Sequence, residues 1–227
     1  MSMETQKESM HAILLACSSL KDFVEQAQIN METDYPVWYL NKSYHKDPAL
    51  MRRQILTALA EIPEEYNTIL VAMGYCGGSW EDIPTERTIV LPRVDDCVSL
   101  LMTVDDIYMP NRKEEGCLYV KEKDPAVCSF QRIFLRYTQN MEPEAVEKVY
   151  TAWKNSYSGI QVIDTGIYDC HAADYMRSVD EDARWLDAES GYVQGGILLL
   201  EKLVSMRWDE QFAVIRPGKR ISAEQFF

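Results

Sequence analysis

The sequence has little positive charge. Of its 227 residues, 23 are Lys or Arg and 36 are Asp or Glu, so the formal net charge is −13. Proteins that bind nucleic acid non-specifically gain affinity when Lys and Arg displace phosphate counterions. This composition therefore argues against a nucleic-acid binder, and for the same reason against binding to an anionic membrane surface.

Long apolar runs are also missing. The longest early run covers residues 12–17, whereas a helix that spans a bilayer needs roughly 20 apolar residues. No basic leader precedes this run, and a secretory signal would need one. We therefore expect a cytoplasmic protein whose six cysteines stay mostly reduced, as buried thiols, metal ligands or redox groups rather than disulfides.

Several common motifs do not occur. The cysteines form no Cys-x-x-Cys pair, and the sequence contains no Gly-x-Ser-x-Gly nucleophile elbow. The loop Gly74-x-x-Gly77-Gly78 lacks the following helix and acidic partner of a dinucleotide fingerprint, and it lacks the Lys-Ser/Thr of a P-loop. Nucleotide binding is therefore disfavoured.

Short apolar runs that alternate with amphipathic segments predict an α/β fold. Residues 68–73 form a continuous apolar run, which is typical of a strand buried on both faces of a parallel sheet. Asp47 and Pro48 begin a helix, with Asp at the cap and Pro in the first turn, and Pro63 ends it. The expected strands cover residues 11–16, 36–40, 68–73, 87–91, 160–163 and 212–215, and the expected helices cover about 20–27, 48–62, 98–102, 143–153, 172–186 and 193–205.

These elements predict a mostly parallel sheet flanked by helices. We expect residues 1–11 to be a flexible N-terminal segment and residues 12–227 to form a single α/β domain. Residues 105–130 are polar and rich in turns, so they would form an excursion. It would separate two similar lobes, at about 12–104 and 131–227, with a crevice between them.

The sharpest candidate site is formed by His45, Cys76 and Cys97. Because parallel strands end at one edge of a sheet, the two cysteines, which follow consecutive expected strands, should lie on neighbouring loops. One imidazole and two thiolates are a known catalytic zinc set that leaves a fourth position for water or a substrate sulfur. Glycines beside Cys76, such as Gly77, let a solute approach the sulfur closely. In the alternative interpretation, both cysteines are small buried residues and His45 is a surface residue.

Neighbouring residues are candidates for supporting roles. Asp95 or Asp96 could be a further ligand or a catalytic base. Arg93 could bind a carboxylate or phosphate of the substrate, although a lone Arg more often pairs with nearby acids. Tyr75 could form the wall of a substrate pocket, and Cys17, which follows the first expected strand, could line the same crevice.

A second group of candidates, Asp169, Cys170 and His171, follows a strand in the second half of the chain. Thiolate and neutral imidazole are both good metal donors, so these residues could add ligands, an acid/base pair or substrate contacts. Adjacent residues point in different directions, and we expect one or two of the three to face a site. Cys117 and Cys128 are expected to be free thiols.

Several motifs occur together along most of the chain. They are Ile13-Leu-Leu-Ala-Cys17, Tyr44-His45-x-x-Pro48, Gly74-Tyr-Cys-Gly77, Pro92-Arg-x-x-Asp-Cys97, Ile163-Asp-Thr-Gly166, and Trp208-Asp-x-x-Phe212 with Pro217-Gly218. Over residues 12–218 this combination resembles the family named domain of unknown function 1638. That family is found chiefly in anaerobic archaea and bacteria, often beside corrinoid-dependent methyltransferases for methylamines and related compounds. The chain departs from the family pattern at Asp95, where the pattern has His, and at Lys123-Asp124-Pro125, where it has an aromatic Gly-Trp element.

The resemblance implies a role in one-carbon metabolism and favours the site of His45, Cys76 and Cys97. We expect these residues to bind a zinc ion that lowers the pKa of a thiol or hydroxyl and presents it as the nucleophile for methyl transfer from a corrinoid. Two other hypotheses remain open. The first is a non-catalytic accessory that binds a corrinoid, its carrier protein or a metal, and the second is a metal-free sensor of a small molecule. An acidic surface suits docking to a basic partner, and a homodimer is expected because closed two-fold assemblies are common.

Overall fold

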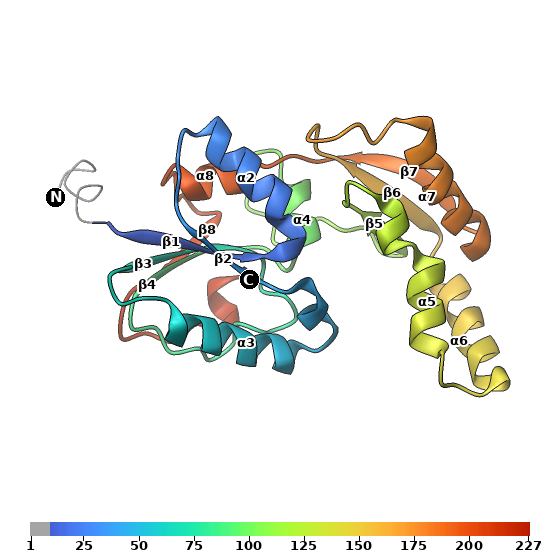
Figure 1. Cartoon of the computed structure of the whole chain (residues 1–227), viewed down its shortest axis with the longest axis horizontal. Helices are drawn as coiled ribbons and strands as arrows, with labels where there is room; N and C mark the ends of the chain where they lie inside the picture. The colour runs from blue at the N-terminus through green and yellow to red at the C-terminus, as the bar shows by residue number, and fades with distance from the viewer. Residues whose placement is uncertain (1–9) are drawn as a thin grey trace. The chain divides into compact units, whose positions relative to one another are not determined.

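The computed structural model describes residues 10–227, so residues 1–9 of the expected flexible segment lie outside the described residues. The described chain is a mixed α/β structure with a five-stranded and a three-stranded sheet (Figure 1), which confirms the predicted fold class. Its contacts divide it into two units. The first contains the described residues up to Arg112 together with Ile197–Phe227, and the second contains Lys113–Gly196. No helix in the described part of the chain has the length and apolar character needed to cross a membrane.

The first unit is built on the five-stranded sheet, with strand order β2-β1-β3-β4-β8. The first four strands are parallel, and β8 runs antiparallel to β4. In Figure 1, α2 and α8 cover one face of this sheet and α3 the other, so every residue of β1 and β3 is buried. The strands are β1 (Ala12–Cys17), β2 (Val37–Leu40), β3 (Thr68–Ala72), β4 (Thr88–Pro92) and β8 (Phe212–Ile215), and the helices are η1 (Ser18–Leu20), α2 (Lys21–Asn30), η2 (Lys42–Lys46), α3 (Pro48–Glu61), α4 (Cys97–Met102), α8 (Leu198–Val204) and η4 (Ala223–Gln225).

The second unit is built on the three-stranded sheet, whose strands β5, β6 and β7 are parallel and lie in that order. Its core joins the apolar side chains of β5 and β6 to those of α7. An aromatic cluster around Phe134 and Trp185, whose ring centroids are 5.1 Å apart, links α5 to α7. The elements are β5 (Cys117–Val120), η3 (Pro125–Cys128), α5 (Phe130–Thr138), α6 (Pro143–Ser156), β6 (Gly159–Asp164), α7 (Ala173–Leu186) and β7 (Glu189–Gln194).

Two stretches differ from the sequence-based expectation. The helix expected over 193–205 begins only at Leu198, because Val193 and Gln194 are the end of β7 and the next backbone N–H, that of Gly195, donates to Asp164 O at 2.9 Å. The expected excursion 105–130 contains β5, which pairs with β6. β5 and β7 are only partly buried, and the apolar signal that marks a central strand is therefore weak in these two strands.

The boundaries of the two units also differ from those of the expected lobes. Residues 197–227 belong to the first unit, because β8 pairs with β4 and places Ile215 opposite Ile89. Residues 113–130 belong to the second unit, since β5 adds a parallel strand beside β6. The first unit is therefore discontinuous in sequence.

Candidate metal centre

Each of four neighbouring parallel strands ends at, or is followed by, a cysteine or histidine, and all four residues lie at the same edge of the first sheet. In the order β2, β1, β3, β4, the residues are His45, Cys17, Cys76 and Cys97. Cys17 is the last residue of β1, and Cys97 is the first residue of α4. His45 lies in η2 after β2, and Cys76 lies in the loop after β3. Ligands bind outside the carboxyl ends of the strands in open α/β sheets, so this edge is a favourable place for a site.

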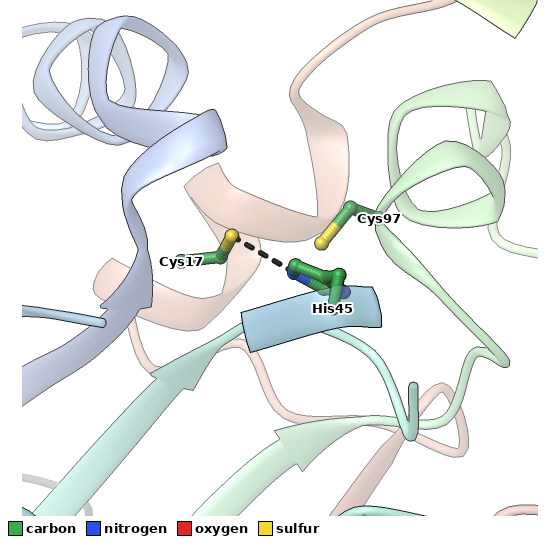
Figure 2. Close-up of side chains that lie close together, drawn as sticks. All are labelled: Cys17, His45 and Cys97. Carbon is green, nitrogen blue, oxygen red and sulfur yellow. Dashed lines mark hydrogen bonds between the residues drawn. The ribbon is translucent and has the colours of Figure 1, made fainter. Parts of the chain in front are cut away.

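Cys17, His45 and Cys97 form a tight trio, in which the ligand atoms all lie within 4.8 Å of one another. Figure 2 shows the three side chains directed toward a common centre, with Cys17 Sγ 3.1 Å from His45 Nε2. The two cysteines are buried, with 0% and 5% exposure, whereas His45 is exposed. The trio therefore has buried sulfurs and an imidazole on the side of the solvent.

Cys76 lies beside this trio, close enough for its thiol to interact with Cys97 and His45, although its sulfur is outside the group of ligand atoms that lie within 4.8 Å of one another. Its backbone has φ = +51°, and Gly77 and Gly78 follow with φ = +66° and +87°. A non-glycine residue with positive φ is uncommon, and such strain is concentrated at functional sites. The two glycines allow the tight loop that directs Cys76 to the other thiols.

The loops that carry Cys76 and Cys97 are held together by backbone contacts. Cys76 N donates to Asp95 O at 2.7 Å. A Cβ atom at Gly74 would lie only 2.6 Å from the Cα atom of Asp96, a distance that side-chain movement cannot relieve. Gly74 is therefore required for the close approach that brings the two cysteines together.

The pKa values follow from the mutual hydrogen bonds of these groups. Hydrogen bonding from Cys97 lowers the pKa of Cys17 to about 4 and that of Cys76 to about 7. Hydrogen bonds to Cys17 and Cys76 raise the pKa of His45 to about 10. The pKa of Cys97 rises well above its usual value, because the neutral thiol interacts favourably with Cys17 and Cys76 and is buried. At neutral pH the metal-free group therefore pairs the Cys17 thiolate with an imidazolium.

Local capping fixes His45 beside Cys17. Asn41 caps η2 by accepting a hydrogen bond from Ser43 N at 2.9 Å. The next backbone N–H, that of Lys42, donates to Ser18 Oγ at 2.9 Å, which joins the loop after β2 to the end of β1. Ser18 and Asn41 thus hold the ends of β1 and β2 together. This brings Cys17 and His45 into contact, although the two residues are 28 positions apart in sequence.

One family model matches a long segment of the chain that contains three of these four residues. The model of the family described as "Protein of unknown function (DUF1638)" matches residues 39–204. The chain belongs to the DUF1638 family. The family resemblance of its motifs is thereby confirmed, and the matched segment of this DUF1638 protein includes His45, Cys76 and Cys97, whereas Cys17 precedes it. Comparisons with curated proteins and with solved structures give no match.

The acids before Cys97 have structural contacts in this DUF1638 protein. Asp96 caps α4, because its Oδ1 accepts hydrogen bonds from Val98 N at 2.9 Å and Ser99 N at 3.0 Å. Asp95 holds the loop through its backbone N–H, which donates to Pro110 O at 2.8 Å. Asp96 therefore positions Cys97 as a helix cap, while the base or ligand role expected of Asp95 or Asp96 stays a prediction.

Arg93 and Tyr75 contact the C-terminal segment. The guanidinium of Arg93 donates to the carbonyl oxygens of Gln225 at 2.8 Å and Glu210 at 2.9 Å. The ring of Tyr75 lies 4.5 Å from that of Phe226. These contacts give both side chains a structural role, and their expected roles toward a substrate stay predictions.

Gly77, in the loop after β3, packs against the first residue of α3. A Cβ atom there would be 3.3 Å from the ring of Pro48, the first residue of that helix. The glycine therefore keeps the Cys76 loop close to α3. The expectation that Gly77 lets a substrate approach the sulfur stays a prediction.

The second group of expected residues lies at the end of β6, in the second unit. Asp164, Cys170 and His171 bring their ligand atoms within 4.8 Å of one another, whereas Asp169 accepts a backbone hydrogen bond from His171 N at 3.1 Å. Burial, together with the charge of Asp164, raises the pKa of Cys170 to about 11. Two of the three expected residues are thus brought together, and Asp164 takes the place of Asp169.

Sequence reasoning undervalued two residues. Cys17 was expected only to line a crevice, yet it is central to the trio. Asp164 was not singled out at all. The available signal was the same for both: each is the last residue of a strand that leads into a turn and a helix, the position where α/β sheets gather functional groups.

Proposed function

We propose that the protein binds a zinc ion through Cys17, His45, Cys76 and Cys97 and uses it to activate a thiol or hydroxyl as a methyl acceptor. The observation that carries this proposal is the convergence of two thiols and one imidazole, those of Cys17, Cys97 and His45, with a third thiol, that of Cys76, beside them; the four residues follow four adjacent parallel strands. Three cysteines and one histidine are a common zinc-binding set.

The donor atoms and their spacing support zinc. Thiolate and imidazole ligands suit zinc better than magnesium or calcium, which prefer oxygen. Zinc lies about 2.3 Å from sulfur and about 2.0 Å from nitrogen, so tetrahedral ligand atoms are roughly 3.5 to 3.8 Å apart. The trio, with all its ligand atoms within 4.8 Å, needs only small side-chain movements to reach this geometry. The low pKa of Cys17 supplies a thiolate, the form that binds metal.

The position of the site favours catalysis over a purely structural role. The ligands lie at or just after the ends of four strands, at the carboxyl edge of the sheet, rather than in one short contiguous segment, and that edge is where α/β proteins bind substrates. His45 is exposed, so a solute can approach from its side. We assign Cys76 as the ligand that a substrate replaces, because its backbone conformation is strained and its side chain stands outside the tight trio.

The chemistry follows from these assignments. A zinc ion held by these ligands would lower the pKa of a substrate thiol or hydroxyl, whose proton would go to solvent, and the resulting anion would attack the methyl carbon of the donor. The new bond joins the substrate sulfur or oxygen to that carbon, and the electron pair of the old bond leaves with the donor. The family resemblance favours a methyl-corrinoid as this donor, in which the cobalt would retain the electron pair.

Metal analysis of variants tests the metal-binding step. The full chain is purified under anaerobic conditions and its zinc content is compared with those of Cys97→Ser and Cys117→Ser. We expect Cys97→Ser to contain about one zinc fewer per chain than the wild type and Cys117→Ser to be unchanged, because Cys117 lies in β5 and outside the cluster. Equal zinc content in all three proteins would overturn the proposal.

A second candidate function is a non-catalytic accessory that binds a corrinoid. The exposed imidazole of His45 favours it, since imidazole is a good ligand for transition metals, and the net charge of −13 suits docking to a basic partner surface. Incubation with cobalamin separates the two candidates. A shift of the cobalamin visible spectrum that His45→Gln abolishes, without any methyl transfer to added thiols, would favour the accessory.

A further inference from the structure

A second set of metal-binding side chains lies in the second unit, where β6 ends. Asp164 is the last residue of this strand, and Cys170 and His171 follow in the loop that leads to α7. His171 Nε2 lies 2.8 Å from Asp164 Oδ2, and the three ligand atoms all lie within 4.8 Å of one another. The arrangement repeats that of the first site, with a buried cysteine and an exposed histidine at the carboxyl end of a parallel strand.

Neighbouring groups hold these side chains in place. Gly166 N donates to Asp164 Oδ1 at 3.2 Å, and this directs the other carboxylate oxygen to His171. The ring of Tyr192, on β7, lies 4.3 Å from that of His171. The hydroxyl of the same tyrosine donates to Cys170 O at 3.4 Å. The imidazole and the cysteine backbone are thus both fixed from the adjacent strand.

We propose that Asp164, Cys170 and His171 bind a second divalent transition-metal ion, with zinc as the natural occupant. A carboxylate oxygen, a thiolate and an imidazole nitrogen are each established zinc ligands. Magnesium and calcium are disfavoured because sulfur and nitrogen are poor donors to these hard cations. Three protein ligands leave the fourth tetrahedral position for water or a substrate atom, the arrangement found in catalytic zinc sites.

The burial of the three residues suits this assignment. Cys170 is 1% exposed, whereas His171 is exposed and Asp164 is half-buried. An ion bound here has the sulfur beneath it and the other two ligands beside it, so its open position faces solvent. The chain contains only three histidines, and two of them lie beside a buried cysteine at such an edge.

This proposal does not rest on the first site, because all its residues belong to the second unit. The alternative is a surface Asp–His pair that lies beside an inert thiol. The two differ in one measurable quantity, the number of metal ions that the chain binds.

The experiment removes metal from the full chain with a chelator, adds excess Zn²⁺ or Co²⁺, removes unbound metal and measures metal per chain. The chains are the wild type, Cys170→Ser, His171→Gln and, as a matched control, Cys117→Ser. His171 is exposed, so its variant tests the site without disturbing the core. Circular dichroism verifies that each variant is folded.

We expect Cys170→Ser and His171→Gln each to bind about one ion fewer than the wild type, and Cys117→Ser to bind as many as the wild type. With Co²⁺, Cys170→Ser should also lose part of the thiolate-to-cobalt absorption in the near ultraviolet. If folded His171→Gln and Cys170→Ser both bind as much metal as the wild type, the proposal is overturned. Failure of the first site has a different signature, since Cys97→Ser would then match the wild type while Cys170→Ser would still bind one ion fewer.

Discussion

Cys17 Sγ and His45 Nε2 lie 3.1 Å apart, although 28 positions separate the two residues in sequence. The contact exists because β1 and β2 are adjacent and parallel and both therefore end at the same edge of the sheet. It joins a buried sulfur to an exposed imidazole. This pair is the basis of the proposed metal centre.

The pKa values of the pair predict how the stability of two variants of the metal-free protein depends on pH. The pKa of Cys17 is lowered from 9.0 to about 4, so its contribution to the free energy of unfolding is complete above pH 9.0 and is lost as the pH falls through 4. The pKa of His45 is raised from 6.5 to about 10, so its contribution is complete below pH 6.5 and is lost as the pH rises through 10.

The pair contributes only where both groups are charged, so we expect Cys17→Ser and His45→Gln each to destabilise the metal-free chain most between pH 6.5 and 9.0. The destabilisation should decrease toward pH 4, where Cys17 is protonated, and toward pH 10, where His45 loses its proton. Urea unfolding at a series of pH values measures both trends, and Cys117→Ser serves as the control. Destabilisation by either variant that does not change with pH would show that the thiolate and imidazolium are not paired.

Gly74→Ala should separate the two cysteine loops. Its Cβ atom would lie 2.6 Å from the backbone of Asp96, and overpacking of this kind destabilises proteins by about 1 to 3 kcal/mol. Because the loops must move apart, zinc affinity should fall as well. Urea unfolding and competition with a chromophoric zinc chelator measure the two effects.

Gly191→Ala is the matched control for this change. Its Cβ atom would approach the side-chain end of Gln161 at 3.0 Å, and that end can rotate away. Unchanged zinc affinity in Gly74→Ala would show that the close approach of the loops is not needed to hold the metal.

Substitutions of Asp96 separate its capping role from a role in proton transfer. Asp96→Ala removes the cap of α4, and loss of such a cap destabilises by about 1 kcal/mol. Asp96→Asn keeps an oxygen that can accept the same hydrogen bonds, and Asn is as good an N-cap as Asp. We therefore expect Asp96→Asn to retain both the stability and the zinc affinity of the wild type, and Asp96→Ala to lose part of each.

A methyl-transfer assay tests whether Asp96 also acts in proton transfer. If Asp96 is instead a catalytic base, Asp96→Asn will fold and bind zinc normally but lose most of its methyl-transfer rate. Thermal unfolding, zinc content and the transfer rate measured on the same samples decide between the cap and the base.

The sequence was most informative where the structure is buried and local. The strand predicted over 212–215 coincides with β8, and the buried run 68–73 contains β3, because continuous apolar residues mark strands covered on both faces. By contrast, β7 has the sequence Glu-Ser-Gly-Tyr-Val-Gln and is mostly exposed or half-buried. Its polar residues removed that signal, so the strand was missed.

The candidate site was partly predictable for a topological reason. Cys76 and Cys97 follow consecutive strands that are adjacent in the sheet, so their proximity could be inferred from chain order. For Cys17 the sequence indicates only a position at the end of a strand; its place among the other ligands depends on β1 lying between β2 and β3, a strand order that the sequence does not reveal. The contacts of Arg93 with Gln225 and Glu210 join residues more than 100 positions apart, and no local pattern indicates them.

X-ray absorption spectroscopy of the zinc-loaded Cys170→Ser chain identifies the zinc ligands at the edge of the first sheet, because this variant removes a thiol of the second proposed site. We expect about one zinc per chain, with about three sulfur ligands near 2.3 Å and one nitrogen ligand near 2.0 Å. A chain that binds no zinc, or zinc surrounded only by oxygen and nitrogen, would show that the three cysteines and His45 do not form a zinc centre.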